Sequence, residues 1–200
     1  MRDAGPDESR LFDIASTQAG YFTAAQARGC GYSHALLAHH AATGRFIRAH
    51  RGLYRLRQYP SSSREEVVAA WLAMGEGAVV SHESALELLG LSDVIPNAIH
   101  LTVPRGRRSH RGLVGTRAHT TTSMPGIDQV TVRDGMPVTS PARTILDVAQ
   151  VGGAPDQVAT AIRQAIQRGM VTPEQLLAGA AVRSSRVERL VRNALDQGAA

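Results

Sequence analysis

The chain has 200 residues, enough for one large domain or two small ones. Its single cysteine, Cys30, excludes an internal disulfide, and the first residues lack the apolar run of a signal peptide. No segment approaches the ~20 apolar residues that a membrane span needs. We therefore expect a cytoplasmic protein with no membrane association.

The net charge of +5 is unevenly distributed along the chain. Residues 14–57 contain six arginines and no acidic residue, residues 58–100 are acidic, and residues 101–117 contain five more arginines without an acid. A long segment without acids lowers the electrostatic cost of approaching phosphates. All basic residues are arginine, which suits bidentate phosphate contacts and is equally explained by a GC-rich genome. The first basic segment predicts a surface that binds nucleic acid.

Three short helices are expected at the start of the chain. The hydrophobic period and the end signals predict helices at residues 9–19 and 34–43, with a short one between them that Thr23 caps and residues 28–29 end. Ser33 caps the third helix, after a turn that contains two glycines. Helix, glycine-bearing turn and helix together are typical of a helix-turn-helix.

A short hairpin is predicted directly after the third helix. The hydrophobic period changes from 3.6 to 2 after Gly44, so residues 46–50 and 53–56 are expected to be strands joined by a turn at residues 51–52. A hairpin in this place is the wing of a winged helix, and it contacts the sugar-phosphate backbone while the preceding helix enters the major groove. The predicted DNA-binding residues are Tyr32, Ser33, His34, His39, Arg45, Arg48, His50 and Arg51.

A linker rich in proline and serine at residues 60–63 marks the expected domain boundary. Residues 1–59 are the predicted winged helix-turn-helix domain, and residues 60–200 are a predicted mixed α/β domain with a helical C-terminal end. The fold class expected for the whole chain is therefore α+β.

The second domain is expected to begin with an amphipathic helix that turns Val67, Ala70, Trp71 and Met74 inward. Further helices are expected at residues 81–89, 141–150, 156–168, 173–178 and 186–196, and strands at residues 78–80, 99–103, 113–117, 130–133 and 136–139. The Asp134-Gly135 pair is a strong hairpin signal between the last two strands.

The second basic segment is expected to lie between two paired strands, the later one returning beside the earlier. It is an exposed hairpin tip, a second contact with nucleic acid, or a surface that contacts a protein partner. The residues that we predict for partner contact are Arg105, Arg107, Arg108 and Arg111.

Two groups of residues have the chemical types needed for catalysis or metal binding, but their spacing does not allow either site. Cys30, His34, His39 and His40 could ligate zinc, yet three of them share one short helix and cannot converge on an ion without help. The residues His82, Glu83 and Ser84 are adjacent, so on a helix they point about 100° apart and cannot form a triad. Ser81 is better explained as the helix cap. The sequence thus predicts no catalytic site, no metal site and no cofactor.

Several segments, in this order, resemble a known family. The sequence from about residue 10 to residue 178 resembles the antitoxins of type IV toxin–antitoxin systems, the AbiEi-like abortive-infection antitoxins. The segments that carry the resemblance are GRFIRAHRGLYRL at 44–56, SHESAL at 81–86, LGL at 89–91, IHLTVPR at 99–105 and PVTSPART at 137–144.

The resemblance implies a protein that binds operator DNA upstream of its own operon and represses it. It also implies that the C-terminal region neutralises a cognate toxin of the nucleotidyltransferase fold. The chain departs from the family in one respect, because residues 33–41 of the recognition helix contain no arginine. That leaves two alternatives open: a protein-interaction module whose winged helix has lost specific DNA binding, and a transcriptional regulator that acts alone.

Overall fold

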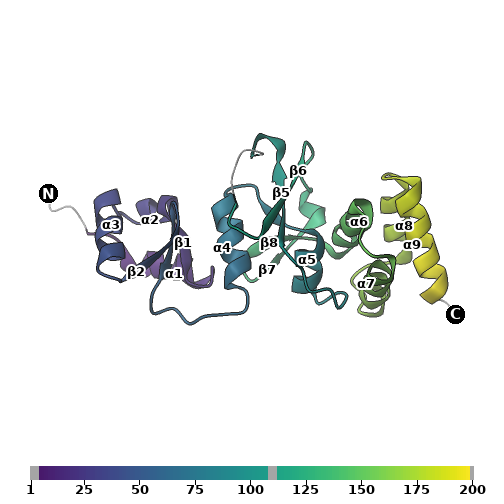
Figure 1. Ribbon diagram of the computed structural model, residues 1–200, viewed down its shortest axis with the longest axis horizontal. Coiled ribbons are helices and arrows are strands. Elements are labelled where there is room, and N and C mark those ends of the chain that lie inside the picture. The colour runs from purple at the N-terminus through teal and green to yellow at the C-terminus, as the bar shows by residue number, and fades with distance from the viewer. Residues whose placement is uncertain (1–4, 108–111, 199–200) are drawn as a thin grey trace. The chain divides into compact units, whose positions relative to one another are not determined.

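The computed structural model describes residues 5–107 and 112–198, and it divides the chain into two compact units (Figure 1). Of the described residues, the first unit contains 5–77 with 112–114 and 134–136, and the second contains the others. Helices and strands occur in both units, so the α+β class expected from the sequence is confirmed. No helix of the described residues is long and apolar enough to cross a membrane.

The first unit is a winged helix (Figure 1). Its sheet has the strand order β1-β3-β2, and both pairings are antiparallel. The three helices and the hairpin confirm the elements expected from the sequence, while the three-residue strand β1 was not predicted. The elements are α1 (Glu8–Ser16), β1 (Tyr21–Thr23), α2 (Ala24–Gly29), α3 (His34–Ala42), β2 (Phe46–His50), β3 (Leu53–Leu56) and α4 (Glu65–Met74).

Side-chain caps fix where the second and third helices begin. Thr23 and Gln26 form a reciprocal capping box at α2, and the Ser33 hydroxyl accepts a hydrogen bond from the Leu36 amide at α3. Each cap satisfies amide groups that have no partner within the helix. Both caps are as predicted, and they set the start of the recognition helix α3.

The core of the first unit is a small aromatic and aliphatic cluster beneath α3. Leu37 of α3 is 1% exposed and belongs to the same cluster as Phe22 of β1 and Phe46 of β2. The rings of Phe22 and Phe46 meet edge to face, with centroids 5.0 Å apart. This packing holds the recognition helix against the sheet that carries the wing.

The second part of the chain contains a five-stranded sheet followed by helices. The strand order is β6-β5-β4-β8-β7, and β4 pairs antiparallel with β5 but parallel with β8. The elements are β4 (Val79–Val80), α5 (His82–Leu89), β5 (Ile99–Pro104), the 3₁₀ turn η1 (Arg105–Arg107), β6 (Thr116–Thr121), the 3₁₀ turn η2 (Ile127–Gln129), β7 (Val130–Arg133), β8 (Met136–Thr139), α6 (Pro141–Val151), α7 (Pro155–Gln167), α8 (Pro173–Ala181) and α9 (Ser185–Gly198).

The pairing of β5 and β6 corrects the expectation from the sequence. The two strands run parallel, with Ile99 opposite Thr116 and Pro104 opposite Thr121, so β6 does not return as the second arm of a hairpin. The chain between them is a crossover connection, because a parallel neighbour must start at the same end of the sheet. The expected strand at residues 113–117 also starts too early.

Two other expectations differ in detail. Helix α4 buries Val68 and Ala69 together with Ala70 and Met74, whereas Val67 and Trp71 are only partly buried. The expected turn at Asp134-Gly135 is present, with positive φ angles of 50° and 75°. The helices α5 to α9 enclose one large apolar core, which contains Leu86, Ile145 and Leu176.

Candidate functional site

The wing presents its polar side chains to solvent. Arg48, His50 and Arg51 are all exposed, and the pairing of β2 with β3 is irregular between Arg48 and His50. Gly52 closes the turn with φ +73°, a conformation that glycine adopts without strain. Its carbonyl accepts a hydrogen bond from the Ala24 amide, so the wing is fastened to the start of α2. The sequence therefore folds into a short, anchored hairpin that carries exposed cations.

The exposed surface of the recognition helix α3 is small and weakly polar. Ser33, His34 and His39 are exposed there, as are Ala35 and Ala38. The Ser33 hydroxyl already caps the helix, which leaves the two imidazoles as the longer polar side chains on this surface.

Tyr32 corrects the predicted set of DNA-binding residues. It is 2% exposed and lies in the core cluster, where its ring is 5.9 Å from the rings of both Phe46 and His40. Its position directly before the cap suggested an exposed side chain, but the helix-turn-helix core uses it as a packing residue. His40 also faces this core, and burial lowers its pKa.

Arg45 lies at the start of the wing but is already paired. Its two terminal nitrogens donate to the two carboxylate oxygens of Glu8, at 3.0 and 2.6 Å. Hydrogen bonding to Arg45 lowers the pKa of Glu8, so the carboxylate is ionised at neutral pH. Arg45 therefore differs from Arg48 and Arg51, which have no carboxylate within ion-pair distance among the described residues.

Arg28 is a candidate that the sequence reasoning did not include. It is exposed at the end of α2, and its guanidinium lies 3.4 Å from Nε2 of His34, at the start of α3. Arg28 is one of the six arginines in the acid-free segment 14–57, but nothing in the linear sequence places it beside His34. The fold thus adds one cation next to the recognition helix.

The second unit contains a cluster of three histidines that the sequence did not predict. His82 begins α5, His100 lies on β5 and His119 lies on β6. The rings of His82 and His119 stack with centroids 3.6 Å apart, and Nε2 of His119 lies 3.2 Å from Nδ1 of His100. One ring nitrogen from each residue lies within 4.8 Å of the other two.

Burial keeps these imidazoles neutral. It is the main cause that lowers the pKa of His82 to about 3 and that of His119 to about 4, with the neighbouring histidines adding to both shifts. Burial also lowers the pKa of His100, although the nearby Glu83 opposes that shift. The three side chains therefore present lone pairs rather than positive charge at neutral pH.

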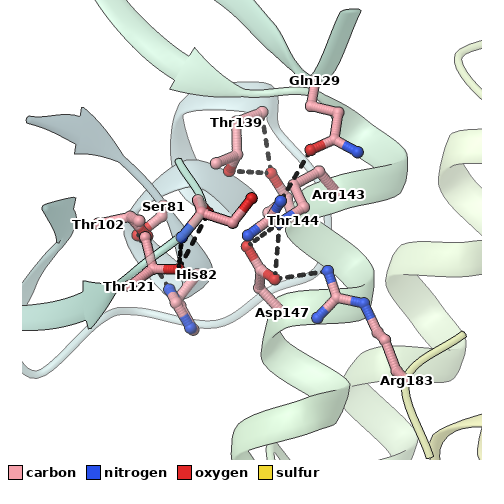
Figure 2. Close-up of polar contacts among 11 residues, drawn as sticks. Ser81, His82, Thr102, Thr121, Gln129, Thr139, Arg143, Thr144, Asp147 and Arg183 are labelled. Atoms are coloured by element: carbon pink, nitrogen blue, oxygen red, sulfur yellow. Dashed lines mark hydrogen bonds and ion pairs between the residues drawn. The ribbon is translucent and has the colours of Figure 1, made fainter. Parts of the chain in front are cut away.

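Beside the histidines lies a network of arginine and aspartate, shown in Figure 2. Asp147 of α6 is 5% exposed and accepts hydrogen bonds from Nε of Arg143 at 2.9 and 2.8 Å, one to each carboxylate oxygen, and from Arg183 at 2.7 Å. Arg143 also donates to Gln129 at 2.8 Å. These contacts hold α6 to the segment before α9 and to η2.

The serines beside His82 have other roles than the sequence suggested, and Ser81 in particular is not the helix cap that we expected. Ser81 precedes α5 but makes no cap hydrogen bond; its hydroxyl instead contacts Nδ1 of His82 at 2.9 Å and accepts from Thr102 at 2.8 Å. Ser84 accepts a hydrogen bond from the backbone amide of His100. His82 has φ +53°, which is unusual for a residue with a side chain. The hydroxyls of Ser81 and Ser84 are thus engaged in holding the cluster and β5.

The predicted partner-contact residues lie in the crossover between β5 and β6. Arg105 is exposed and begins the turn η1, which ends at Arg107. Arg108 and Arg111 lie outside the described residues. Because the strands are parallel, this segment is not the hairpin tip that one interpretation of the sequence expected.

Comparison with known proteins covers both parts of the chain. Residues 9–57 match the family described as transcriptional regulator, AbiEi antitoxin, and residues 77–197 match the family described as AbiEi antitoxin C-terminal domain. The chain is also similar to the crystal structure of the RV2827C protein from Mycobacterium tuberculosis, with 16% identity and a TM-score of 0.64. That similarity covers 95% of this chain and 76% of the other, and at this identity it supports the fold alone. No curated protein matches.

Proposed function

Because the chain belongs to the AbiEi antitoxin family, we propose that it is the DNA-binding antitoxin of a type IV toxin–antitoxin system. It represses its own operon by binding operator DNA upstream, and it neutralises a toxin of the nucleotidyltransferase type. In this proposal residues 1–59 bind DNA, residues 60–200 act on the toxin, and the chain contributes no catalytic site.

The proposal that the chain binds DNA rests mainly on the wing. Arg48, His50 and Arg51 are exposed on one anchored hairpin, and neither arginine is neutralised by a described carboxylate. Arginines free to form charge-assisted hydrogen bonds with phosphate supply affinity and position the protein on the duplex. In the proposal the wing therefore provides most of the affinity.

The recognition helix contributes less in this proposal. His34 and His39 can donate to base acceptors in the major groove, with Arg28 adding a charge beside His34. The remaining exposed side chains of α3 are small, so few base edges can be contacted directly. Ser33, His34, His39 and the wing residues form the proposed interface, which Arg45 joins only when it is released from Glu8.

The DNA-binding half is tested by fluorescence anisotropy of the full chain on its own promoter fragment, across a salt series and against scrambled DNA. The Arg48→Ala/Arg51→Ala variant cannot make two of the proposed phosphate contacts, so its slope of log K against log salt is smaller by about 2. The matched control is Arg163→Ala/Arg189→Ala, which removes the same charge from exposed positions on α7 and α9.

Two outcomes decide this half. A preference for the promoter fragment, with a shallower salt slope in the wing variant and an unchanged slope in the control, supports the proposal. Equal binding to promoter and scrambled DNA at every salt concentration contradicts autorepression and leaves a protein-interaction module as the surviving function.

The toxin half is tested in growth assays with the nucleotidyltransferase encoded beside this gene. Co-expression of the chain restores growth in the proposal, and the effect depends on the ratio of the two proteins because neutralisation is stoichiometric. Replacing Arg105, Arg107, Arg108 and Arg111 with glutamate weakens the rescue, since these residues are proposed to contact the toxin. Rescue by catalytic amounts of the chain would contradict the absence of an enzymatic role.

A further inference from the structure

The histidine cluster of the second unit has the spacing of a metal site. Nδ1 of His100 and Nε2 of His119 are 3.2 Å apart, and one ring nitrogen from each of the three histidines lies within 4.8 Å of the other two. Zinc binds imidazole nitrogen at about 2.0–2.1 Å in tetrahedral geometry, which places two ligands about 3.4 Å apart. The pair His100 and His119 is therefore already at the separation of two ligands on one zinc ion.

The backbone brings the three residues together by parallel strand pairing. His119 of β6 lies opposite Thr102 of β5. Thr102 is two residues beyond His100, so His100 and Thr102 lie on the same face of β5, and His119 is beside them. His82 joins them as the first residue of α5, just after β4, and it has φ +53°. A residue with a side chain keeps such a strained conformation only where its surroundings fix it, and such positions cluster at ligand sites.

The outer nitrogens of the cluster also have suitable partners. Nε2 of His100 is buried without a hydrogen bond and lies 3.8 Å from a carboxylate oxygen of Glu83. Nδ1 of His82 contacts the Ser81 hydroxyl at 2.9 Å, and that hydroxyl is held by Thr102. Histidines that bind metals donate their second N–H to a carboxylate or another oxygen, which fixes the tautomer. The arrangement leaves Nδ1 of His100 and Nε2 of His82 for an ion.

Coordination requires one adjustment in the cluster. The rings of His82 and His119 are stacked at an interplanar angle of 13°, so their in-plane lone pairs lie in two nearly parallel planes and do not converge on one point. A shared ion needs one ring to turn out of the stack. His119 is the less buried of the two and has more room to turn.

We propose that His82, His100 and His119 bind one zinc ion, with water in the fourth position. Three imidazoles without a thiolate suit a divalent ion of borderline softness, whereas Ca²⁺ and Mg²⁺ prefer oxygen ligands. The ion joins the start of α5 to β5 and β6, so it fastens one edge of the sheet to the helix. The sequence predicted no metal site, and the only group that it considered was Cys30, His34, His39 and His40.

The test titrates zinc into the full chain after treatment with a chelator, followed by calorimetry and by metal analysis after gel filtration. The wild type binds one zinc per chain. The His119→Gln variant binds at least about 100-fold more weakly, and Glu83→Gln, which removes an outer carboxylate, about 10-fold to 100-fold more weakly. The matched control is His34→Gln, an exposed histidine of α3, which leaves zinc binding unchanged.

A second measurement on the wild type avoids any dependence on variant folding. Cobalt(II) loaded into the stripped protein shows the intense visible absorption of a tetrahedral, nitrogen-ligated ion if the cluster binds it. Weak absorption like that of the hydrated ion overturns the proposal. So does a wild type that retains no stoichiometric zinc, or a folded His119→Gln variant that binds zinc as tightly as His34→Gln does.

Discussion

The pair of Glu8 and Arg45 leads to a prediction in which loss of an acidic residue strengthens DNA binding. Arg45 follows the recognition helix directly, but both of its terminal nitrogens donate to the Glu8 carboxylate. The Glu8→Gln substitution removes that charge and releases the guanidinium for phosphate. Both side chains are about half exposed, so the substitution leaves the winged helix folded.

The size of the effect follows from counterion release. Each added phosphate contact steepens the slope of log K against log salt by about 0.9, which is a further 3.5-fold loss of affinity between about 50 and 200 mM salt. Glu8→Gln therefore binds DNA more tightly than the wild type at low salt, and the advantage shrinks as salt rises. Arg45→Ala alone leaves the slope nearly unchanged, because the paired arginine makes no phosphate contact.

The assay is a double-mutant cycle by fluorescence anisotropy on the promoter fragment. The variants are Glu8→Gln, Arg45→Ala and both together, each across the salt series. In the double variant the gain from Glu8→Gln disappears, because the released guanidinium is absent. If Arg45→Ala weakens binding as much as Arg48→Ala does in the wild-type background, Arg45 contacts DNA despite Glu8 and the reasoning is refuted.

The same pair determines a pH dependence. Arg45 lowers the pKa of Glu8 in the folded chain, so the stabilisation from this pair is present above the unfolded pKa and is lost as pH falls through the folded value. Both values lie below neutrality, so the pair stays intact between about pH 6 and 8. DNA affinity measured over this range is expected to show no change that depends on Glu8.

Three substitutions test the packing and the polar network. Leu37→Ala removes a buried contact of the recognition helix and costs about 2–5 kcal/mol, measured by urea unfolding with Trp71 fluorescence. Gly52→Ala meets no atom within 4 Å, so only the strain at φ +73° remains, about 1–2 kcal/mol by the same assay. Asp147→Ala leaves Arg143 and Arg183 without their carboxylate and costs about 3–5 kcal/mol, measured by far-UV circular dichroism in urea. A loss below about 1 kcal/mol for Leu37→Ala or Asp147→Ala would contradict the burial described for that site.

The winged helix could be predicted because its signals are local. Thr23, Gln26 and Ser33 cap helices within three residues of themselves, and the change of period after Gly44 marks the wing. The strand β1 was missed because three residues are too few to show a period. Tyr32 was misplaced because a residue just before a cap can face either solvent or core, and only the packing of Phe46 and His40 decides which.

The histidine cluster could not be predicted from the sequence. His82, His100 and His119 are about equally far apart along the chain, with no short motif that joins any two of them. They meet because β5 and β6 pair in parallel, whereas the sequence suggested a hairpin. A hairpin register places different residues opposite each other, so an error in strand direction hides the cluster completely.

Parallel pairing of β5 and β6 also limits how the arginine segment can be altered. From the end of β5 at Pro104 the chain must return to the start of β6 at Thr116, beside Ile99, a distance of about 17–20 Å along the strand. The connection consists of residues 105–115, which reach at most about 36–40 Å when fully extended. Deleting four residues would shorten the fully extended connection to about 23–25 Å, only a few ångströms more than the distance along the strand that it must cover. The parallel pairing therefore sets a lower limit on the length of this segment, because the segment must still span the strand for β6 to keep its register with β5.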